Sequence, residues 1–460
     1  MYTGLIRFND KNCVFKLKNY DLEIEEIENR DEVYINDLES IFNPDKRETI
    51  SLNVLVGKDF DNGKVMHFNP YKITKTGAKT FCASLSSYIV FDDKESTIEG
   101  LKLNSEELNW FHNVEHSYSF TISPENGNSE IKIEPYDRTD KRFSFNIEGQ
   151  KIEGNLNISR TFSRVSTMPL KLKTDMNLYF KATNNFALIE RLSNITFNFL
   201  KFVTYRRNIT FNQLTLMSKY RDTDKYHKVG TLHIKGFNKD RIEEEKVIQN
   251  QLIDLPYLEN ELGKLFDDLA ENKIYLTHIP ESHADNNTIT PARFILVTAG
   301  FEWQFRSTYK ELNTESEDKY KELKDEIISF LDEKINQHTG KNKKYFKSHK
   351  NLLMKTSMTL ADKINWALRE FNDELNLFIK SVYEMNGINN YKYSEISERI
   401  QNQRNNIAHG NLDKEFNNIV VLDLFVLEWL YYAMVLNSMG VSRSKIKSAI
   451  NKLFKRGFAV

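Results

Sequence analysis

The sequence predicts an α+β protein, with a β-rich N-terminal region at residues 1–250 and an all-helical bundle at residues 251–460. Two patterns predict this division. In the first part, apolar and polar residues alternate with the period of two that is typical of half-buried strands. Beyond about residue 250, apolar residues recur at helical spacing, and Gly and Pro become rare. A chain of 460 residues is long enough for about two or three domains.

Strand patterns are clearest around Phe143, Phe145 and Ile147, which alternate with polar residues. Residues 119–122 and 130–133 flank a Pro-Glu-Asn-Gly-Asn segment, which predicts a β-hairpin. Further expected elements are strands at 156–158 and 231–234 and a helix at 185–203.

Residues 21–48 carry a strong excess of acidic side chains. Such a face repels phosphate, so we do not expect nucleic acid to bind there. It is either a solvated surface or a protein-binding face.

Helical signals follow one another in the second part of the chain. Thr290-Pro291 has the form of an N-cap followed by proline at the first helical position. A single helix is expected from about Leu360 to Tyr383, and a shorter one from about Tyr393 to Ala408, which ends at Gly410. The stripe of the longer helix comprises Ile364, Leu368, Phe371, Leu375, Phe378 and Val382. An apolar helix at 420–436 and a basic amphipathic helix complete the expected bundle.

Composition excludes several classes of protein. The net charge of −1 shows no global polycation, so any affinity for nucleic acid depends on local patches. Two cysteines, Cys13 and Cys82, provide neither a disulfide framework nor a cysteine zinc site, which favours a reducing, cytoplasmic setting. The N-terminus lacks the pattern of a secretory signal. We expect no membrane span, because the apolar run 420–436 is short for a bilayer and contains Asp423 and Glu428.

Common catalytic and phosphate-binding motifs are absent from the sequence, including G-x-G-x-x-G, the P-loop, H-E-x-x-H and G-x-S-x-G. His112 and His116 are four residues apart and could share a helix face, but no third metal ligand is obvious. We therefore interpret them as polar surface histidines and expect neither a metal nor a cofactor.

The stretch Arg404–Gly410 is the most suggestive chemically. Arg404 is permanently charged, and His409 is titratable near neutral pH. Metal-free RNA cleavage needs a base or acid near neutral pKa and a fixed cation beside the phosphorus, and Asn405 could orient either group. Five helical steps separate the Arg404 and His409 side chains by about 140°, so both can face one pocket only if the last turn loosens at Gly410.

A structural interpretation stays open for these residues. Arg and His in the last turn of a helix also interact favourably with its dipole and its free carbonyl groups. Spacing alone is weak support, since Arg221 and His227 fall in a similar window by chance. Arg221, however, lies in a charged turn, whereas Arg404 lies within a helical bundle pattern.

The segment Arg404–Gly410, between a helix and a following apolar helix, resembles the R-x4-6-H signature of the HEPN superfamily. The aromatic segment Phe301–Phe305 resembles the first core helix of HEPN domains in ApeA-type anti-phage proteins. The β-rich first half, with its helix at 186–203, is similar to the N-terminal region of that family.

This resemblance implies a helical domain that forms a homodimer, in which two such motifs build one metal-independent endoribonuclease site. Arg404 and His409 are then expected to be catalytic and Asn405 supportive. The N-terminal region is expected to sense a phage component, such as a phage protein, and to restrain or release the nuclease. Abortive infection through damage to RNA, tRNA among the candidates, is the implied outcome. The alternative is a non-catalytic HEPN sensor or scaffold that dimerises and binds RNA or a partner protein.

Two basic stretches of the helical region are the expected RNA-binding surface. Residues 341–355 and 429–460 contain no acidic residue, and Tyr345 and Phe346 could stack on bases. The expected RNA contacts are Lys343, Lys344, Lys347, Lys445, Lys452, Lys455 and Arg456. Each stretch could instead be a solvated basic face. Within the apolar helix, we expect Asp423 and Glu428 to pair with cations of the bundle, Arg404 among the candidates.

Overall fold

The computed structural model describes residues 1–27, 52–77, 79–93, 95–122, 127, 129–165, 167–209, 211, 213–221, 223–236, 243–310, 312, 321–354, 358–411, 416 and 418–459. The chain divides into two compact units, Met1–Gln249 and Asn250–Val460, next to the boundary expected from the sequence. The first unit is β-rich and the second is helical, which confirms the α+β fold class. The acidic segment 21–48 lies mostly outside the described residues.

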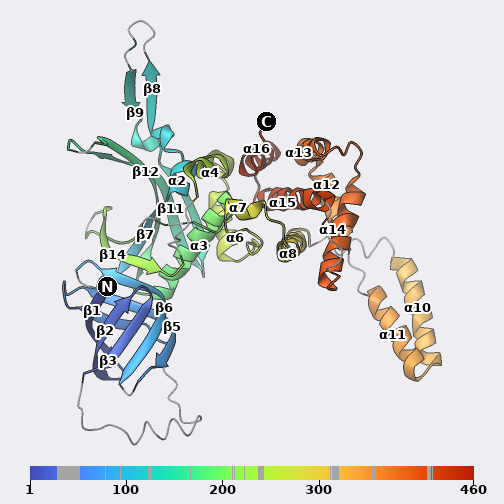
Figure 1. The fold of residues 1–460 in the computed structure, drawn as a ribbon, viewed down its shortest axis with the longest axis horizontal. Helices are drawn as coiled ribbons and strands as arrows, with labels where there is room; N and C mark the ends of the chain where they lie inside the picture. The colour runs from blue at the N-terminus through green and yellow to red at the C-terminus, as the bar shows by residue number, and fades with distance from the viewer. Residues whose placement is uncertain are drawn as a thin grey trace, which may run out of the picture. The chain divides into compact units, whose positions relative to one another are not determined.

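Six strands of the N-terminal unit close into an antiparallel barrel (Figure 1). They are β1 (Tyr2–Phe8), β2 (Lys11–Lys18), β3 (Asp21–Glu26), β4 (Leu55–Asp59), β5 (Val65–Lys75) and β6 (Thr80–Phe91). The barrel closes because β5 pairs with both β4 and β6. Phe15 and Phe68, whose ring centroids are 5.1 Å apart, fill its interior with other buried apolar residues.

The long strand β6 joins the barrel to the rest of the sheet. Its first half pairs with β3 and its second half with β14, while β5 lies along its other edge. The sheet continues in the order β14-β13-β7-β12-β11-β10. These strands are β7 (Ile98–Asn104), β10 (Lys141–Ile147), β11 (Gln150–Phe162), β12 (Leu170–Thr183), β13 (Gln213–Lys219) and β14 (Tyr226–Ile234). The expected strands at 143–147, 156–158 and 231–234 fall within β10, β11 and β14.

Helix α3 (Phe186–Thr204) is joined to the sheet by a partly buried polar contact. The Glu190 carboxylate accepts hydrogen bonds from Asn69 at 2.8 Å and from Ser87 at 3.1 Å, which ties α3 to β5 and β6. The expected hairpin is present as β8 (Tyr118–Ile122) and β9 (Ser129–Ile133), with most of its turn outside the described residues. The remaining elements of this unit are α2 (Glu106–Phe111), the 3₁₀ turns Val114–Ser117 and Tyr136–Arg138, and α4 (Glu245–Asn250) at the boundary.

Helix α15 (Asn418–Ser438) is the centre of the helical unit and packs against five others, namely α8 (Pro291–Thr308), α12 (Leu360–Glu370), α13 (Asn372–Met385), α14 (Tyr393–Ala408) and α16 (Arg443–Leu453). Its length and composition would suit a membrane span, but 83% of its most apolar window is buried within the protein. It is therefore a core helix. The other helices are α5 (Leu255–Leu258), α6 (Leu262–Ala270), α7 (His283–Asn286), α10 (Lys321–Gln337) and α11 (Gly340–Met354).

The helix expected from Leu360 to Tyr383 is two helices, so the expectation of one continuous helix is wrong. Helix α12 ends and α13 begins at Phe371, where φ is −103° and ψ is 24°. Asn372 and Asp373, two residues of low helix propensity, follow this break. The stripe itself is correct, because Ile364, Leu368, Phe371, Leu375, Phe378 and Val382 are all buried.

Two carboxylates of α15 are buried, and each is paired with an arginine of another helix. Arg399 of α14 donates to Asp423 through Nε at 2.7 Å and through Nη2 at 2.8 Å, and the Tyr383 hydroxyl of α13 donates to the same carboxylate. Arg293 of α8 donates to Glu428 at 2.6 Å. The expectation that these acids pair with bundle cations is correct. Arg404 as a partner is wrong, because it lies about 140° around α14 from Arg399.

These ion pairs are held in a poorly hydrated interior. The Asp423 side chain is fully buried, and that of Arg399 is 26% exposed. Burial raises the pKa of Asp423, against the opposing hydrogen bonds from Arg399 and Tyr383. The hydrogen bond to Asp423 in turn raises the pKa of Arg399. Removing one partner of such a pair therefore leaves the other charge unpaired in the core.

Replacing Arg399 by Ala should lower the free energy of unfolding by about 3–5 kcal/mol, the usual cost of leaving a buried charge unpaired. The matched control Arg404→Ala, at an exposed position of the same helix, should change it by less than about 0.5 kcal/mol. Urea denaturation followed by tryptophan fluorescence measures both, because Trp303, Trp366 and Trp429 lie in this unit. Equal effects of the two substitutions would contradict this assignment.

Candidate functional site

The C-terminal end of α14 carries the predicted motif. His409 caps the helix, and Gly410 follows with φ of +74°, a left-handed conformation that favours glycine. The Gly410 N–H donates to the Ile407 carbonyl at 3.1 Å, and the Asn411 N–H donates to the Asn406 carbonyl at 2.9 Å. This is the Schellman arrangement, so the sequence Asn-Ile-Ala-His-Gly ends the helix as a well-formed turn.

The structure brings Arg404 to Asn405 but not to His409. Arg404 Nη1 donates to Asn405 Oδ1 at 3.3 Å. Within the described residues, no hydrogen bond joins Arg404 to His409, and the helix stays regular through Ala408. The expected loosening of the last turn is therefore not observed, and on an ideal helix five steps separate the two positions by about 140°. Both are exposed to solvent.

Helix α14 is placed firmly although its end is exposed. Ile396, Ile400 and Gln403 are buried on its inner face, which packs against α8, α12 and α15. The Ala361 N–H of α12 donates to Gln401 Oε1 at 2.9 Å, and Arg399 provides the ion pair with α15. The motif is thus presented from a helix that is fixed on several sides.

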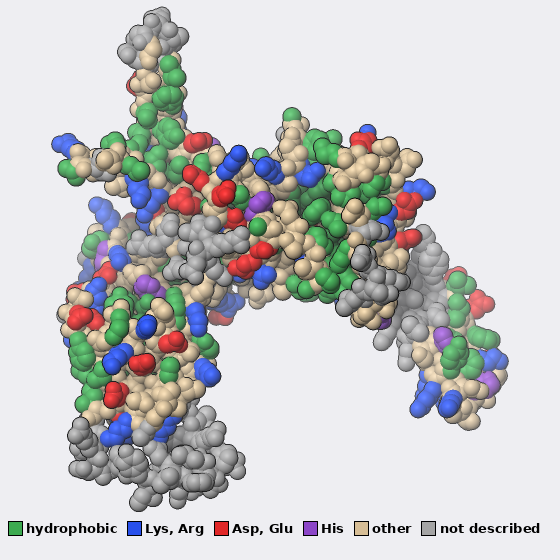
Figure 2. Space-filling model, viewed as in Figure 1, with side chains coloured by type: hydrophobic (Ala, Val, Ile, Leu, Met, Phe, Trp, Pro, Cys, Tyr) green, Lys and Arg blue, Asp and Glu red, His purple; other side chains and the backbone are tan. Residues whose placement is uncertain are grey.

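The first basic stretch lies on α11, which packs against α10 as a helical hairpin (Figure 1). Figure 2 shows Lys and Arg side chains, in blue, on the surface of this hairpin. Lys344 and Lys347 are exposed, and Lys343 is half-buried. The Tyr345 ring is 63% exposed, which leaves it accessible for stacking, whereas Phe346 is half-buried and stacks on His338 with ring centroids 5.4 Å apart. Of the predicted RNA-binding lysines, Lys344 and Lys347 are thus accessible to solvent, as contact with phosphate requires.

The second basic stretch is only partly available. Lys452 donates to both carboxylate oxygens of Asp254, at 2.6 and 2.5 Å. The Arg456 guanidinium lies 4.8 Å from the centre of the Trp429 ring, and burial lowers its pKa. These two side chains have structural roles. Lys455 is exposed, Lys445 is half-buried, and Lys452 and Lys455 line a cavity of about 340 Å³ beside Tyr257.

His112 and His116 do not form a metal centre in the described part of the chain, where no group of three His, Cys, Asp or Glu residues is close enough to hold an ion. His112 is buried, with Nε2 2.7 Å from the Thr139 carbonyl oxygen, so its expected surface position is wrong. Thr174 Oγ1 donates to the His112 carbonyl at 2.7 Å, which fixes this segment against β12.

Sequence reasoning missed Arg399, Tyr383 and Arg293 as the groups that position the site. The acidic residues in an apolar helix did predict that cations of the bundle would pair with them, since a buried carboxylate needs a cation. The sequence did not indicate whether Arg399 or Arg404 is the partner of Asp423, because each lies about 70° from the buried stripe of α14, on opposite sides of it.

No protein-family model, no curated protein and no solved structure matches this chain. The relationship to the HEPN superfamily therefore rests on the residues themselves and stays a prediction.

Replacing Lys344 and Lys347 together by Ala should weaken binding of single-stranded RNA and reduce the slope of log affinity against log salt by about 1 for each lost phosphate contact. Lys452→Ala should lower the free energy of unfolding, because it removes the contact to Asp254, and should change RNA affinity little. Fluorescence anisotropy of labelled RNA over a salt series measures the slopes. An unchanged slope in the double variant would remove α11 from the RNA surface.

Proposed function

We propose that this protein is a metal-independent endoribonuclease of a bacterial anti-phage system, acting in the cytoplasm as a homodimer. Two copies of the α14 end, each with Arg404, Asn405 and His409, form one composite site. The proposal includes a regulatory N-terminal unit that senses a phage component. Abortive infection through cleavage of RNA, with tRNA among the candidate substrates, is the proposed outcome.

The unpaired guanidinium of Arg404 is the observation that carries this proposal. Arg293, Arg399 and Arg443 in the same unit each contact a carboxylate. Among the residues that the structure describes, Arg404 has no carboxylate partner, and its guanidinium donates a hydrogen bond to Asn405 Oδ1 at 3.3 Å. An exposed arginine without a carboxylate partner, on a helix that is packed on several sides, is available to bind a phosphate group.

The chemistry follows from the two groups. The His409 imidazole accepts the proton of a ribose 2′-hydroxyl, and the resulting oxygen attacks the adjacent phosphorus. Arg404 stabilises the negative charge that develops on the phosphoryl oxygens, while Asn405 orients the guanidinium. The 5′-oxygen leaves with a proton from an acid, the role that the second histidine of the dimer would fill. The products are a 2′,3′-cyclic phosphate and a 5′-hydroxyl end.

Since five ideal helical steps separate Arg404 and His409 by about 140°, the proposal includes a second copy. A guanidinium from one protomer then lies against an imidazole from the other. If the domain only dimerises and binds RNA or a partner protein, the purified protein leaves RNA intact even in the presence of its trigger.

His409→Ala or Arg404→Ala should reduce RNA cleavage by at least about 100-fold, the usual contribution of a general acid–base group or of a positioned charge donor. Both positions are exposed, so both variants should fold. Asn402→Ala, an exposed position of the same helix, is the matched control and should cleave normally. Cleavage that survives in both variants would reject the assignment of the catalytic residues.

Cleavage should continue in excess EDTA and should leave 2′,3′-cyclic phosphate ends, because the attacking oxygen belongs to the substrate itself. End-specific ligation followed by sequencing of the fragments identifies these termini. A strict requirement for divalent metal, or 3′-hydroxyl ends, would contradict the mechanism.

A further inference from the structure

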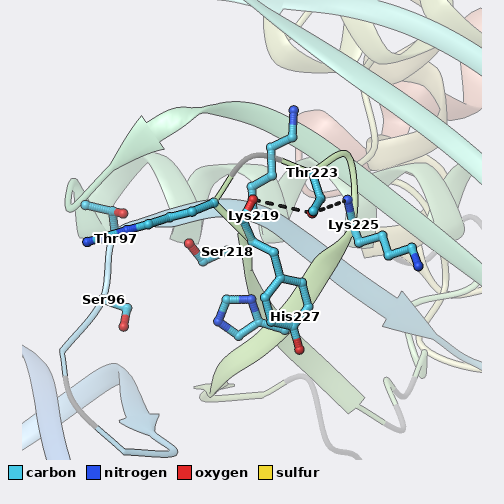
Figure 3. Close-up of a pocket in the computed structure, with 9 residues that line it drawn as sticks. Ser96, Thr97, Ser218, Lys219, Thr223, Lys225 and His227 are labelled. Atoms are coloured by element: carbon cyan, nitrogen blue, oxygen red, sulfur yellow. Dashed lines mark hydrogen bonds between the residues drawn. The ribbon is translucent and has the colours of Figure 1, made fainter.

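The β13–β14 hairpin of the N-terminal unit borders a cavity of about 700 Å³ (Figure 3). This volume lies within the range of about 300–1,000 Å³ that is usual for small-molecule sites. Among the residues that the structure describes, those that line it are polar or basic and include no carboxylate: Ser96, Thr97, Ser218, Lys219, Tyr220, Arg221, Thr223, Lys225 and His227. The cavity therefore suits an anion better than a cation or an apolar ligand.

The turn of the hairpin brings the basic groups together. Ser218 lies opposite His227 in the strand register, and Lys219 lies opposite Tyr226. The Tyr220 N–H donates to the Lys225 carbonyl at 2.9 Å, and the Lys225 N–H donates to Thr223 Oγ1 at 3.2 Å. Arg221 and His227, which are six residues apart in the chain, thereby line one cavity.

Neighbouring acidic groups leave these cations accessible. Lys219 contacts Asp224 at 2.8 Å, but Asp224 is fully exposed, so the pair is weak and easily exchanged for a ligand. Glu99 lies outside the lining, and its Oε2 accepts hydrogen bonds from the Ser218 hydroxyl at 3.0 Å and from the Lys219 N–H at 2.7 Å. In Figure 3 the Lys219 and Lys225 side chains extend outward from the turn, while His227 lies closer to Ser218.

The cavity also has an aromatic wall. The Tyr220 and His227 rings lie with their centroids 4.3 Å apart, and Tyr220 is 52% exposed. Nδ1 of His227 is shielded from solvent and has no hydrogen-bond partner within the described residues. A flat, exposed ring beside three permanent cations matches a ligand with both a base to stack and a phosphate chain to neutralise.

We propose that this cavity binds a phosphorylated nucleotide, with Arg221, Lys219 and Lys225 on the phosphates and Tyr220 beneath the base. Thr97 and Thr223 line the same cavity and offer hydroxyl groups for hydrogen bonds to phosphate or ribose oxygens. The ligand is either a free nucleotide or one nucleotide of an RNA strand, since both present the same chemistry. This site belongs to the N-terminal unit alone and does not depend on the proposed nuclease.

Isothermal titration calorimetry of the full-length protein with ATP, tripolyphosphate and a five-nucleotide oligouridylate tests the proposal. Arg221→Ala and, as a second variant, Lys225→Ala should each weaken binding by about tenfold, the effect of losing one charge-assisted contact. Tyr220→Ala should weaken ATP or oligouridylate binding but leave tripolyphosphate binding unchanged. Lys228→Ala is the matched control, because Lys228 is an exposed cation of β14, three residues after Lys225, and does not line the cavity.

The two sources of the nucleotide give different results. Equal or tighter binding of ATP than of oligouridylate identifies a free nucleotide, whereas binding of oligouridylate at least about tenfold tighter identifies a strand of RNA. Absence of binding to all three probes would overturn the proposal. So would an equal loss of affinity in Lys228→Ala and Arg221→Ala, since binding would then reflect only the general charge of the hairpin.

Discussion

The buried ion pair between Asp423 of α15 and Arg399 of α14 is the contact on which the placement of the candidate site depends. It is bidentate, and the Tyr383 hydroxyl satisfies the same carboxylate, so three helices meet at one fully buried acid. Because such a pair is costly to break, α14 has little freedom to rotate about its axis. The direction in which Arg404 and His409 point follows from this restraint.

A second pair acts on the other side of α15. Arg293 donates to Glu428 at 2.6 Å and also to the Asn286 side chain at 2.6 Å, so the ion pair extends into the segment that precedes α8. Both acids lie in a helix that is otherwise apolar on nearly all sides. They give this helix a fixed rotation within the bundle, which apolar packing alone would specify weakly. The rigidity that a catalytic pair needs is thus built into the core, away from the exposed end of α14.

Local patterns in the sequence were sufficient for the fold class and for most elements. Thr290 caps α8 as its sequence predicts, and the buried stripe from Ile364 to Val382 follows the expected spacing. Contacts between distant residues were not predictable in the same way. The barrel closes through the pairing of β5 with β6. Arg221 and His227 line one cavity because the chain turns back between them as a hairpin. From their spacing along the chain, Arg221 and His227 were interpreted as a chance match, whereas in the folded hairpin both line a basic cavity.

The two Arg–His pairs of this protein differ in a physically instructive way. Arg404 and His409 lie at the end of one helix, where five ideal helical steps separate them by about 140°, so the proposed site takes its guanidinium and imidazole from two copies of the chain. Arg221 and His227 lie on either side of a turn and line a common space, which suits binding by one chain. The proposed site at Arg404 and His409 needs a second copy of the chain, whereas the proposed site at Arg221 and His227 does not.

The most direct test of the central claim is a cross-link between two copies at the end of α14. With Cys82 replaced by Ser and Asn405 by Cys, mild oxidation should give a disulfide-linked dimer, because the proposed composite site places the two α14 ends side by side, and a disulfide forms where two Cα atoms come within about 4.4–6.8 Å. Lys380→Cys, an exposed position on α13, should stay monomeric under the same conditions and serves as the control. An Asn405→Cys variant that remains monomeric on a denaturing gel, or that cross-links no faster than the control, would contradict the composite site.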